Sequence, residues 1–321
     1  MDWFEQLTGF KENGYEQTRR NLEVEGPYLR SRVNGRRYRI GELELVSLQD
    51  LRRRAASDGP RGSLGLRTVV GDVRRLHREA EYAGALFQVA SQFNLLEMVG
   101  PDITPEQGVT RYALDPTQGP ACAIAAGAAT IYRNYFVPIG DERGQTAQRQ
   151  LDALAAVGEK LSRETGQPID RLWRMRNGYT DCTPQGLEAI SAWLESAGPE
   201  GRDELRSLLR IGLHRDVQVT EADGEDQLVS QAFCSALPVA YFNRPPRKWQ
   251  PFAELVLEAA YEATLLATAL NAGRGASNIV MLTRLGGGAF GNEDHWIDGA
   301  LKRALTIAEG LALDVRMVRR G

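Results

Sequence analysis

A run of glycines near the C-terminal end is the part of the sequence best suited to binding an anion. Gly286, Gly287 and Gly288 are consecutive, and the segment continues with Ala289, Phe290, Gly291 and Asn292. Successive glycines allow close approaches that a Cβ atom would prevent, and their N–H groups can form a concavity for an anion. A predicted strand precedes the segment and a predicted helix follows it, so the N-terminus of that helix would add partial positive charge. Phe290 could cover a sugar or a base.

The spacing of these glycines is not that of two common nucleotide-binding loops. A P-loop would have Lys-Ser/Thr after the glycines, and a dinucleotide-binding loop would have the order GxGxxG with an acid on a second strand. The sequence therefore predicts either another kind of phosphate-binding loop or a glycine-rich turn without a chemical role.

Neutral polar side chains follow an apolar run at residues 85–90. Ser91, Gln92 and Asn94 suit hydrogen bonds to ribose hydroxyls or to the edge of a base. Glu97 is the nearest acid and is our candidate for a proton-transfer role. Alternatively, Ser91 and Asn94 cap a turn and Glu97 is solvated.

A third polar segment leads into a run of small residues that we expect to be a buried helix over 121–131. Unpaired N–H groups at the start of that helix could face a phosphate. A helix start that is merely capped would have the same pattern. The candidate binding residues of this segment are Gln118, Gly119, Pro120 and Ala121.

The composition bounds the class of protein. The 321 residues include 39 Lys and Arg against 42 Asp and Glu, which gives a net charge of −3. We therefore do not expect nucleic-acid binding driven by overall charge. Binding through a local basic groove is an alternative that stays open. Three cysteines and three histidines lack the spacing of a zinc cage, so we expect reduced thiols in a cytoplasmic protein and no metal or cofactor. The N-terminus lacks the pattern of a signal peptide, and no stretch approaches the roughly 18 apolar residues of a membrane span.

Strands and helices alternate along most of the chain. An Asn34-Gly35 turn predicts a hairpin, and Ser47 is a plausible cap for a helix over 47–57. Strands are expected at 66–70, 85–90, 132–137, 208–222 (before an Asp223-Gly224 turn), 228–242, 279–282 and 313–318, and helices at 73–82, 121–131, 149–164, 184–197, 251–275 and 295–311. This order predicts an α/β fold with a mixed sheet and helices on both faces. We expect an N-terminal extension over 1–60 and one domain over 61–321 with a helical insertion at 143–210.

The order of these segments resembles the macrodomain superfamily, in particular its poly(ADP-ribose) glycohydrolase-like branch. GGGAFG at 286–291 is similar to the family's loop Gly-(Cys/Gly)-Gly-Ala-Phe-Gly, and SQFN at 91–94 is similar, more loosely, to its Asn-bearing turn. The resemblance covers about residues 64–140 and 211–321. It implies a three-layer fold that binds ADP-ribose, with the diphosphate on 286–292, Phe290 on the distal ribose, Asn94 at the ribose hydroxyls and further N–H donors at 119–121.

One departure from the family concerns catalysis. The glycohydrolase branch has Gln-Glu-Glu where this sequence reads QGPACAIAAGAAT, which contains no acid. A catalytic acid would have to come from elsewhere, and the candidates are Glu97, Asp102, Glu106 and Asp115. Binding is therefore better supported than hydrolysis. Two alternatives stay open: a non-catalytic reader of ADP-ribosylated macromolecules, and an interaction protein without a nucleotide ligand. The oligomeric state is not predicted.

Overall fold

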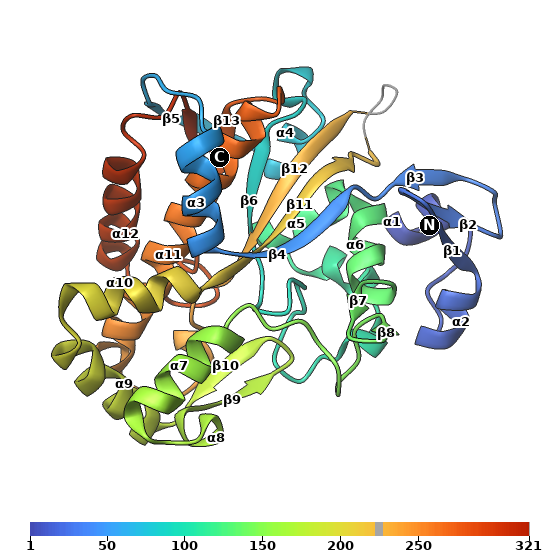
Figure 1. Ribbon diagram of the computed structural model, residues 1–321. Coiled ribbons are helices and arrows are strands. Elements are labelled where there is room, and N and C mark those ends of the chain that lie inside the picture. The colour runs from blue at the N-terminus through green and yellow to red at the C-terminus, as the bar shows by residue number, and fades with distance from the viewer. Residues whose placement is uncertain (222–226, 321) are drawn as a thin grey trace.

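A seven-stranded mixed sheet lies at the centre of the computed structural model, which describes residues 1–221 and 227–320 (Figure 1). The strand order is β4 (Glu42–Ser47), β11 (Arg210–Gln218), β12 (Leu228–Cys234), β6 (Leu86–Ala90), β13 (Ile279–Leu282), β14 (Asp314–Arg319) and β5 (Gly65–Val70). The strands from β12 to β5 run parallel, and β11 runs antiparallel to both of its neighbours. The predicted mixed sheet is confirmed. The predicted Asp223-Gly224 turn lies outside the described residues.

Alternate residues of the inner strands face two different apolar layers. On β6, Leu86 packs with one buried cluster while Phe87 and Val89 pack with another, and on β13 Leu282 and Met281 divide in the same way. A strand with both faces covered needs apolar residues at nearly every position, which explains the continuous apolar run at 85–90.

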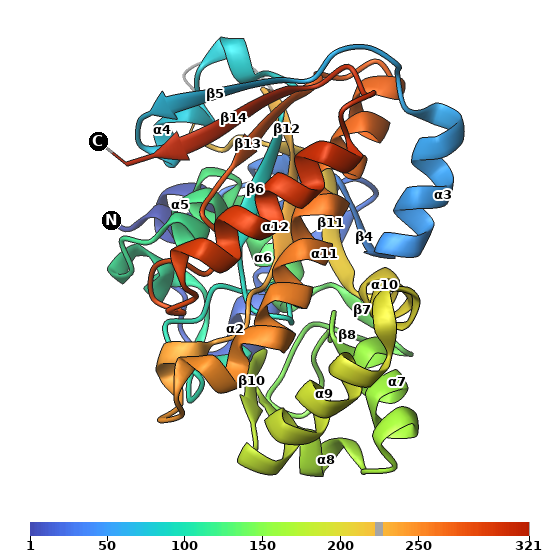
Figure 2. The same cartoon turned by 90° about the vertical axis from the view of Figure 1, so that its left-hand side faces the viewer.

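Helices cover both faces of the sheet, as predicted. One face is covered by α3 (Leu48–Asp58), α11 (Pro246–Gly273) and α12 (Asp294–Ile307); in Figure 2, α11 and α12 lie in front of the strands and α3 is at the right. The other face is covered by α4 (Val73–Leu76), α5 (Gln118–Ala125) and α6 (Gly127–Tyr135). No helix in the described part of the chain is both long and apolar enough to span a bilayer.

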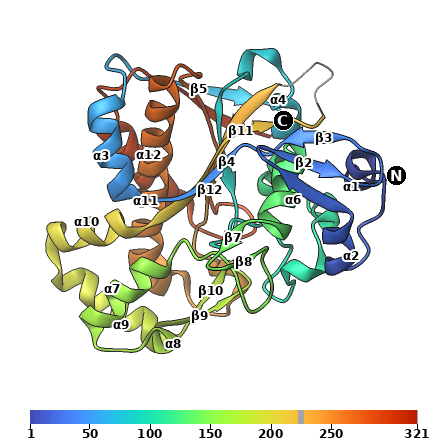
Figure 3. The ribbon, with the colours of Figure 1, turned by 45° about the vertical axis from the view of Figure 1, so that its right-hand side comes forward.

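The N-terminal residues contribute to two different parts of the molecule. A small module consists of α1 (Trp3–Thr8), α2 (Tyr15–Arg20), β1 (Leu22–Glu25), β2 (Tyr28–Ser31) and β3 (Arg37–Arg39), and it packs beside α6 (Figure 3). The Asn34-Gly35 turn joins β2 to β3, so the hairpin is confirmed. The cap is also confirmed, because Ser47 Oγ accepts the Asp50 N–H at 3.1 Å. The expected division at residue 60 does not coincide with this arrangement, since β4 pairs with β11 in the central sheet.

The segment expected as a helical insertion forms a separate layer below the sheet in Figure 1. It contains α7 (Ala155–Thr165), α8 (Ile169–Leu172), α9 (Pro184–Ser196) and α10 (Gly198–Leu208). It also contains a hairpin that we do not predict, formed by β9 (Trp173–Arg176) and β10 (Tyr179–Cys182). Asn177 and Gly178 have φ of 47° and 80°, so this hairpin has the Asn-Gly turn chemistry that is also present at residues 34–35. A short ribbon of β7 (Pro138–Ile139) and β8 (Glu142–Arg143) precedes the layer.

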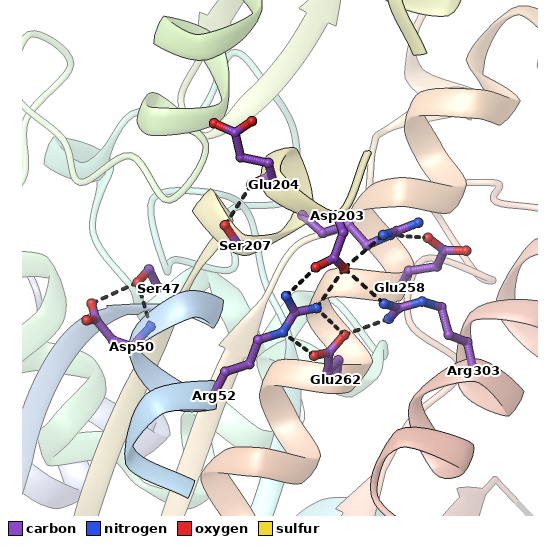
Figure 4. A network of polar contacts seen from close by, with 10 residues as sticks. Ser47, Asp50, Arg52, Asp203, Glu204, Ser207, Glu258, Glu262 and Arg303 are labelled. Carbon is purple, nitrogen blue, oxygen red and sulfur yellow. Dashed lines mark hydrogen bonds and ion pairs between the residues drawn. The ribbon is translucent and has the colours of Figure 1, made fainter. Parts of the chain in front are cut away.

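An ion-pair network joins α10 of this layer to three helices of the core (Figure 4). Glu262 on α11 is buried and accepts from Arg52 of α3 at 2.5 Å and from Arg303 of α12 at 2.6 Å. Asp203 of α10 accepts from Arg52 at 2.7 Å. These contacts fix how the layer and the core helices meet.

Two predicted elements are wrong. The helix expected over 73–82 ends at Leu76, because the carbonyls of His77 and Glu79 accept hydrogen bonds from Gln227 Nε2 at 2.7 and 3.0 Å and leave the helical pattern. The strand expected over 132–137 is instead the last part of α6. Ile131 and Tyr135, four residues apart, are buried in one cluster, which is a helical spacing.

Candidate functional site

A cavity of about 320 Å³ opens where the five parallel strands end. Its walls come from segments that follow β5, β6, β12, β13 and β14, together with the start of α5 and one residue of β10. The lining residues are Gly71–Val73, Ala90–Gln92, Glu97, Met98, Asp115–Ala121, Tyr179, Ala236, Tyr241, Thr283–Gly286, Gly288–Phe290, Val318 and Arg320. The three segments singled out in the sequence therefore share one cavity.

The glycine-rich loop divides its N–H groups between itself and the cavity. The amides of Gly287, Gly291 and Asn292 donate to carbonyls within the loop at 2.9–3.0 Å. Within the described chain, no acceptor faces the amides of the other four residues, and those four are the ones that line the cavity: Gly286, Gly288, Ala289 and Phe290. Unpaired amides that converge on a cavity are suited to an anion.

Three of the predicted binding residues support the loop from behind and are not on the cavity wall. Gly287 and Gly291 use their amides inside the loop. Asn292 is buried, and its Nδ2 donates to Leu237 O at 2.8 Å. The left-handed φ of 75° at Gly286 and the short distance of 2.5 Å from its added Cβ to Ala236 Cβ explain why a glycine stands there.

The start of α5 adds two further donors. The N–H groups of Gln118 and Gly119 have no acceptor among the described residues. A Cβ at Gly119 would lie 1.9 Å from Ala90 O, so only glycine allows α5 to begin so close to β6. The Gln118 side chain is used structurally, because its Oε1 accepts the Ala90 N–H at 3.0 Å and its Nε2 donates to Gln88 O at 2.7 Å.

Three aromatic rings form one end of the cavity. Tyr179, Tyr241 and Phe290 have ring centroids 5.0–5.5 Å apart, and all three line the wall. Tyr179 belongs to the hairpin of the insertion, and its hydroxyl donates to Met98 O at 2.6 Å. The sequence analysis placed Phe290 in the site and did not include Tyr179 or Tyr241.

Most polar side chains in the turn after β6 form hydrogen bonds within that turn. Gln92 lines the cavity, but its amide donates to Met98 O at 3.3 Å and accepts the Met98 N–H at 2.8 Å. Ser91 lines the wall and donates to Gln92 O at 3.0 Å. Asn94 is not on the wall, since its amide accepts the Leu96 N–H and donates to Gln150. The geometry thus gives Asn94 the turn-capping role and not contact with ribose.

Glu97 is a buried wall residue, so the expectation that it is solvated is wrong. Neither carboxylate oxygen has a hydrogen-bond partner in the described part of the chain, and Arg133 Nη2 lies 3.6 Å from Oε1. Burial raises the pKa of Glu97 to about 8, and this effect outweighs the opposing attraction of Arg133. The side chain lies against Gly119, with Cγ 3.3 Å from the position of an added Cβ.

The other candidate acids have different surroundings. Asp102 pairs with Arg176, and Glu106 accepts the Ala147 N–H at 3.0 Å; neither lines the cavity. Asp115 lines the cavity, and its Oδ1 accepts the Thr117 N–H at 2.9 Å. Asp72, which sequence reasoning missed, also lines it, and the signal was its position directly after a predicted strand.

The described residues contain no cluster of side chains suited to bind a metal ion. No group of three or more His, Cys, Asp or Glu side chains there is arranged to hold an ion. The three cysteines are buried free thiols. The cations on the cavity wall are Arg284, which pairs with Asp294 and Asp298, and Arg320, which donates to Pro116 O at 3.1 Å.

Comparison with known proteins gives a distant structural likeness. No protein-family model and no curated protein sequence matches the chain. Among solved structures, the chain is similar to poly(ADP-ribose) glycohydrolase from Deinococcus radiodurans in complex with ADP-ribose, at 12% identity and a TM-score of 0.40, over 87% of this chain and 86% of that one. Two point mutants of that enzyme match at 13% identity over 87% of both chains, with TM-scores of 0.39 and 0.40.

Proposed function

We propose that the cavity binds ADP-ribose or a closely related nucleotide diphosphate. The observation that carries the proposal is that six residues with unpaired backbone amides, four of the glycine-rich loop and two at the start of α5, line one cavity. A pyrophosphate offers enough acceptors to satisfy such donors, and a helix N-terminus favours its negative charge.

The two ends of the cavity suit the two groups that flank the pyrophosphate of this ligand, the terminal ribose and the adenosine. The aromatic end, formed by Tyr179, Tyr241 and Phe290, offers ring faces for a ribose. At the other end, Asp72 Oδ1 accepts the Arg75 N–H at 3.0 Å, and the second carboxylate oxygen is left to accept the exocyclic amine of adenine.

Hydrolysis of an ADP-ribosyl linkage is a second candidate function, and Glu97 favours it. A carboxyl group with a pKa of about 8 is protonated at neutral pH and can donate a proton to a leaving oxygen. Both carboxylate oxygens are covered, so the side chain must turn toward the cavity before it can act. Binding without turnover, as in a reader of ADP-ribosylated macromolecules, requires no such movement, and we rank it first.

Calorimetric titration with ADP-ribose tests the binding proposal, and the chain offers a matched pair of variants. An added Cβ meets nothing within 4 Å at either Gly288 or Gly299, so both positions tolerate a side chain. Gly288→Glu puts a carboxylate beside the proposed pyrophosphate and should weaken binding at least about 10-fold. Gly299→Glu on α12 adds the same charge at a residue that does not line the cavity and should leave binding unchanged.

The results of these measurements distinguish between the candidate functions. Absence of heat and of any thermal stabilisation at millimolar ADP-ribose would reject the nucleotide-binding proposal and leave an interaction protein. Release of free ADP-ribose from a modified protein would add the hydrolase function to binding.

A further inference from the structure

A second groove of about 500 Å³ adjoins the cavity at the ends of β13 and β14. It shares Thr283, Arg284, Val318 and Arg320 with the cavity wall. Its remaining lining residues are Asp294, Asp298 and Arg319. A ligand held in the cavity can therefore extend into the groove without leaving the protein surface.

Some charged side chains of the groove have an ion-pair partner, and others do not. Asp294 and Asp298 each contact the Arg284 guanidinium at 2.7 Å, so these three groups largely satisfy one another. Arg319 is exposed and makes no ion pair or side-chain hydrogen bond with any described residue, and Arg320 contacts only a carbonyl, Pro116 O. Two guanidinium groups without an acidic partner are thus left at the junction of groove and cavity.

One side of the groove, formed by the end of β14, lies beside the end of β5, which Asp72 follows. Asp72 follows β5, and β5 pairs in parallel with β14, so that Arg319 is the register partner of Val70, two residues before Asp72. The adenosine half of the ligand, assigned above to the Asp72 end, would therefore be the half next to Arg319 and Arg320.

We propose that this groove binds a further phosphate group carried on the adenosine ribose of the nucleotide. The proposal rests on the function proposed above, because it takes the position of the adenosine from it. Guanidinium groups recognise phosphate through paired, charge-assisted hydrogen bonds, and Arg319 is free to supply them. ADP-ribose without this substituent leaves the Arg319 side chain unused. The preferred ligand class is thus a nucleotide diphosphate with a phosphorylated ribose.

The test is a calorimetric comparison of ADP-ribose with ADP-ribose 2′-phosphate at one fixed salt concentration. We expect the 2′-phosphate to bind the unmodified protein about 10-fold more tightly. Arg319→Gln should remove that preference without changing the affinity for ADP-ribose, since Arg319 does not line the cavity. Arg319→Glu should reverse the preference by charge repulsion.

A matched control and the contrary outcomes make the result decisive. Arg53, an exposed arginine of α3, lies outside both lining sets, so Arg53→Gln should retain the preference. Equal affinity for the two ligands in the unmodified protein would overturn this inference and leave nucleotide binding intact. A preference that persists in Arg319→Gln would overturn it as well. Absence of binding by both ligands would overturn the inference together with the proposed function.

Discussion

At the scale of single residues, Glu97 on the cavity wall forms a buried pair with Arg133, which does not line the cavity. Arg133 is fully buried; its Nε donates to Leu95 O at 3.1 Å, and its guanidinium lies 3.8 Å from the centroid of the Phe233 ring. Burial and the neighbouring Arg133 hold the pKa of His214 well below its usual value, so this histidine is neutral. Glu97 is left without a hydrogen-bond partner among the described residues, and such a buried group calls for a functional explanation.

The raised pKa of Glu97 predicts a pH dependence of stability. The folded state holds its proton up to about pH 8, whereas the unfolded chain loses it near pH 4.5. The folded state therefore binds more protons in this window, and stability should fall as pH rises from 4.5 to 8. The total loss is a few kcal/mol, at about 1.4 kcal/mol per pKa unit.

Urea unfolding of Glu97→Gln and the unmodified protein between pH 7 and 9 would measure this effect. The range avoids His77, whose pKa is lowered to about 4 by burial and which titrates near 6.5 when unfolded. We expect the difference in unfolding free energy between the two proteins to change up to pH 8 and then to level off. Parallel profiles over the whole range would contradict the assignment.

At the scale of elements, the ion pairs around Glu262 determine how four helices meet. The carboxylate is 2% exposed and contacts both Arg52 and Arg303, and these two arginines also share Asp203. Arg206 extends the network, because its Nε donates to Glu258 on α11 at 2.6 Å while its Nη1 donates to Asp203 at 3.0 Å.

Glu262→Ala should destabilise the protein by about 1–3 kcal/mol, because Arg52 and Arg303 lose charge-assisted hydrogen bonds to a buried carboxylate and keep only Asp203 as an acidic partner. Equilibrium unfolding in urea would measure the loss. Glu309, an exposed acid after α12, provides the control, since Glu309→Ala should shift the free energy of unfolding by no more than about 0.5 kcal/mol. A similar small shift for both variants would show that the network contributes little.

At the scale of the whole molecule, the site depends on parts that are far apart in the chain. The tip of the insertion hairpin packs on the turn after β6: the Phe93 N–H donates to Gly178 O, and Gln150 Nε2 donates to Asn177 Oδ1. The N-terminal module supports the loop before α5 from outside, because Glu12 accepts the amides of Val109 and Thr110 at 2.9 and 2.7 Å. A ligand in the cavity would therefore couple the sheet to the insertion.

Hydrogen exchange with and without ADP-ribose tests this coupling. Protection should rise in the glycine-rich loop, in the turn at 91–98 and in the hairpin at 173–182, because the ligand contacts a wall drawn from all three. At 100 times the dissociation constant, the ligand should also stabilise the folded state by about 2.7 kcal/mol. Protection confined to the glycine-rich loop would show that the insertion does not take part in binding.

Local patterns in the sequence predicted six of the seven strands of the central sheet (all but β4), the Ser47 cap, the Asn34-Gly35 hairpin and the loop at residues 286–292. Each of these follows from side-chain periodicity or from backbone freedom within a few residues. The tertiary structure decided which loop residues line the cavity with unpaired amides, because the amides of Gly287, Gly291 and Asn292 are used within the loop, and it assigned Asn94 to the turn. It also decided the burial of Glu97 and the placement of Tyr179, because the contact of Glu97 with Gly119 of α5 and the docking of the insertion hairpin join segments that no local pattern connects.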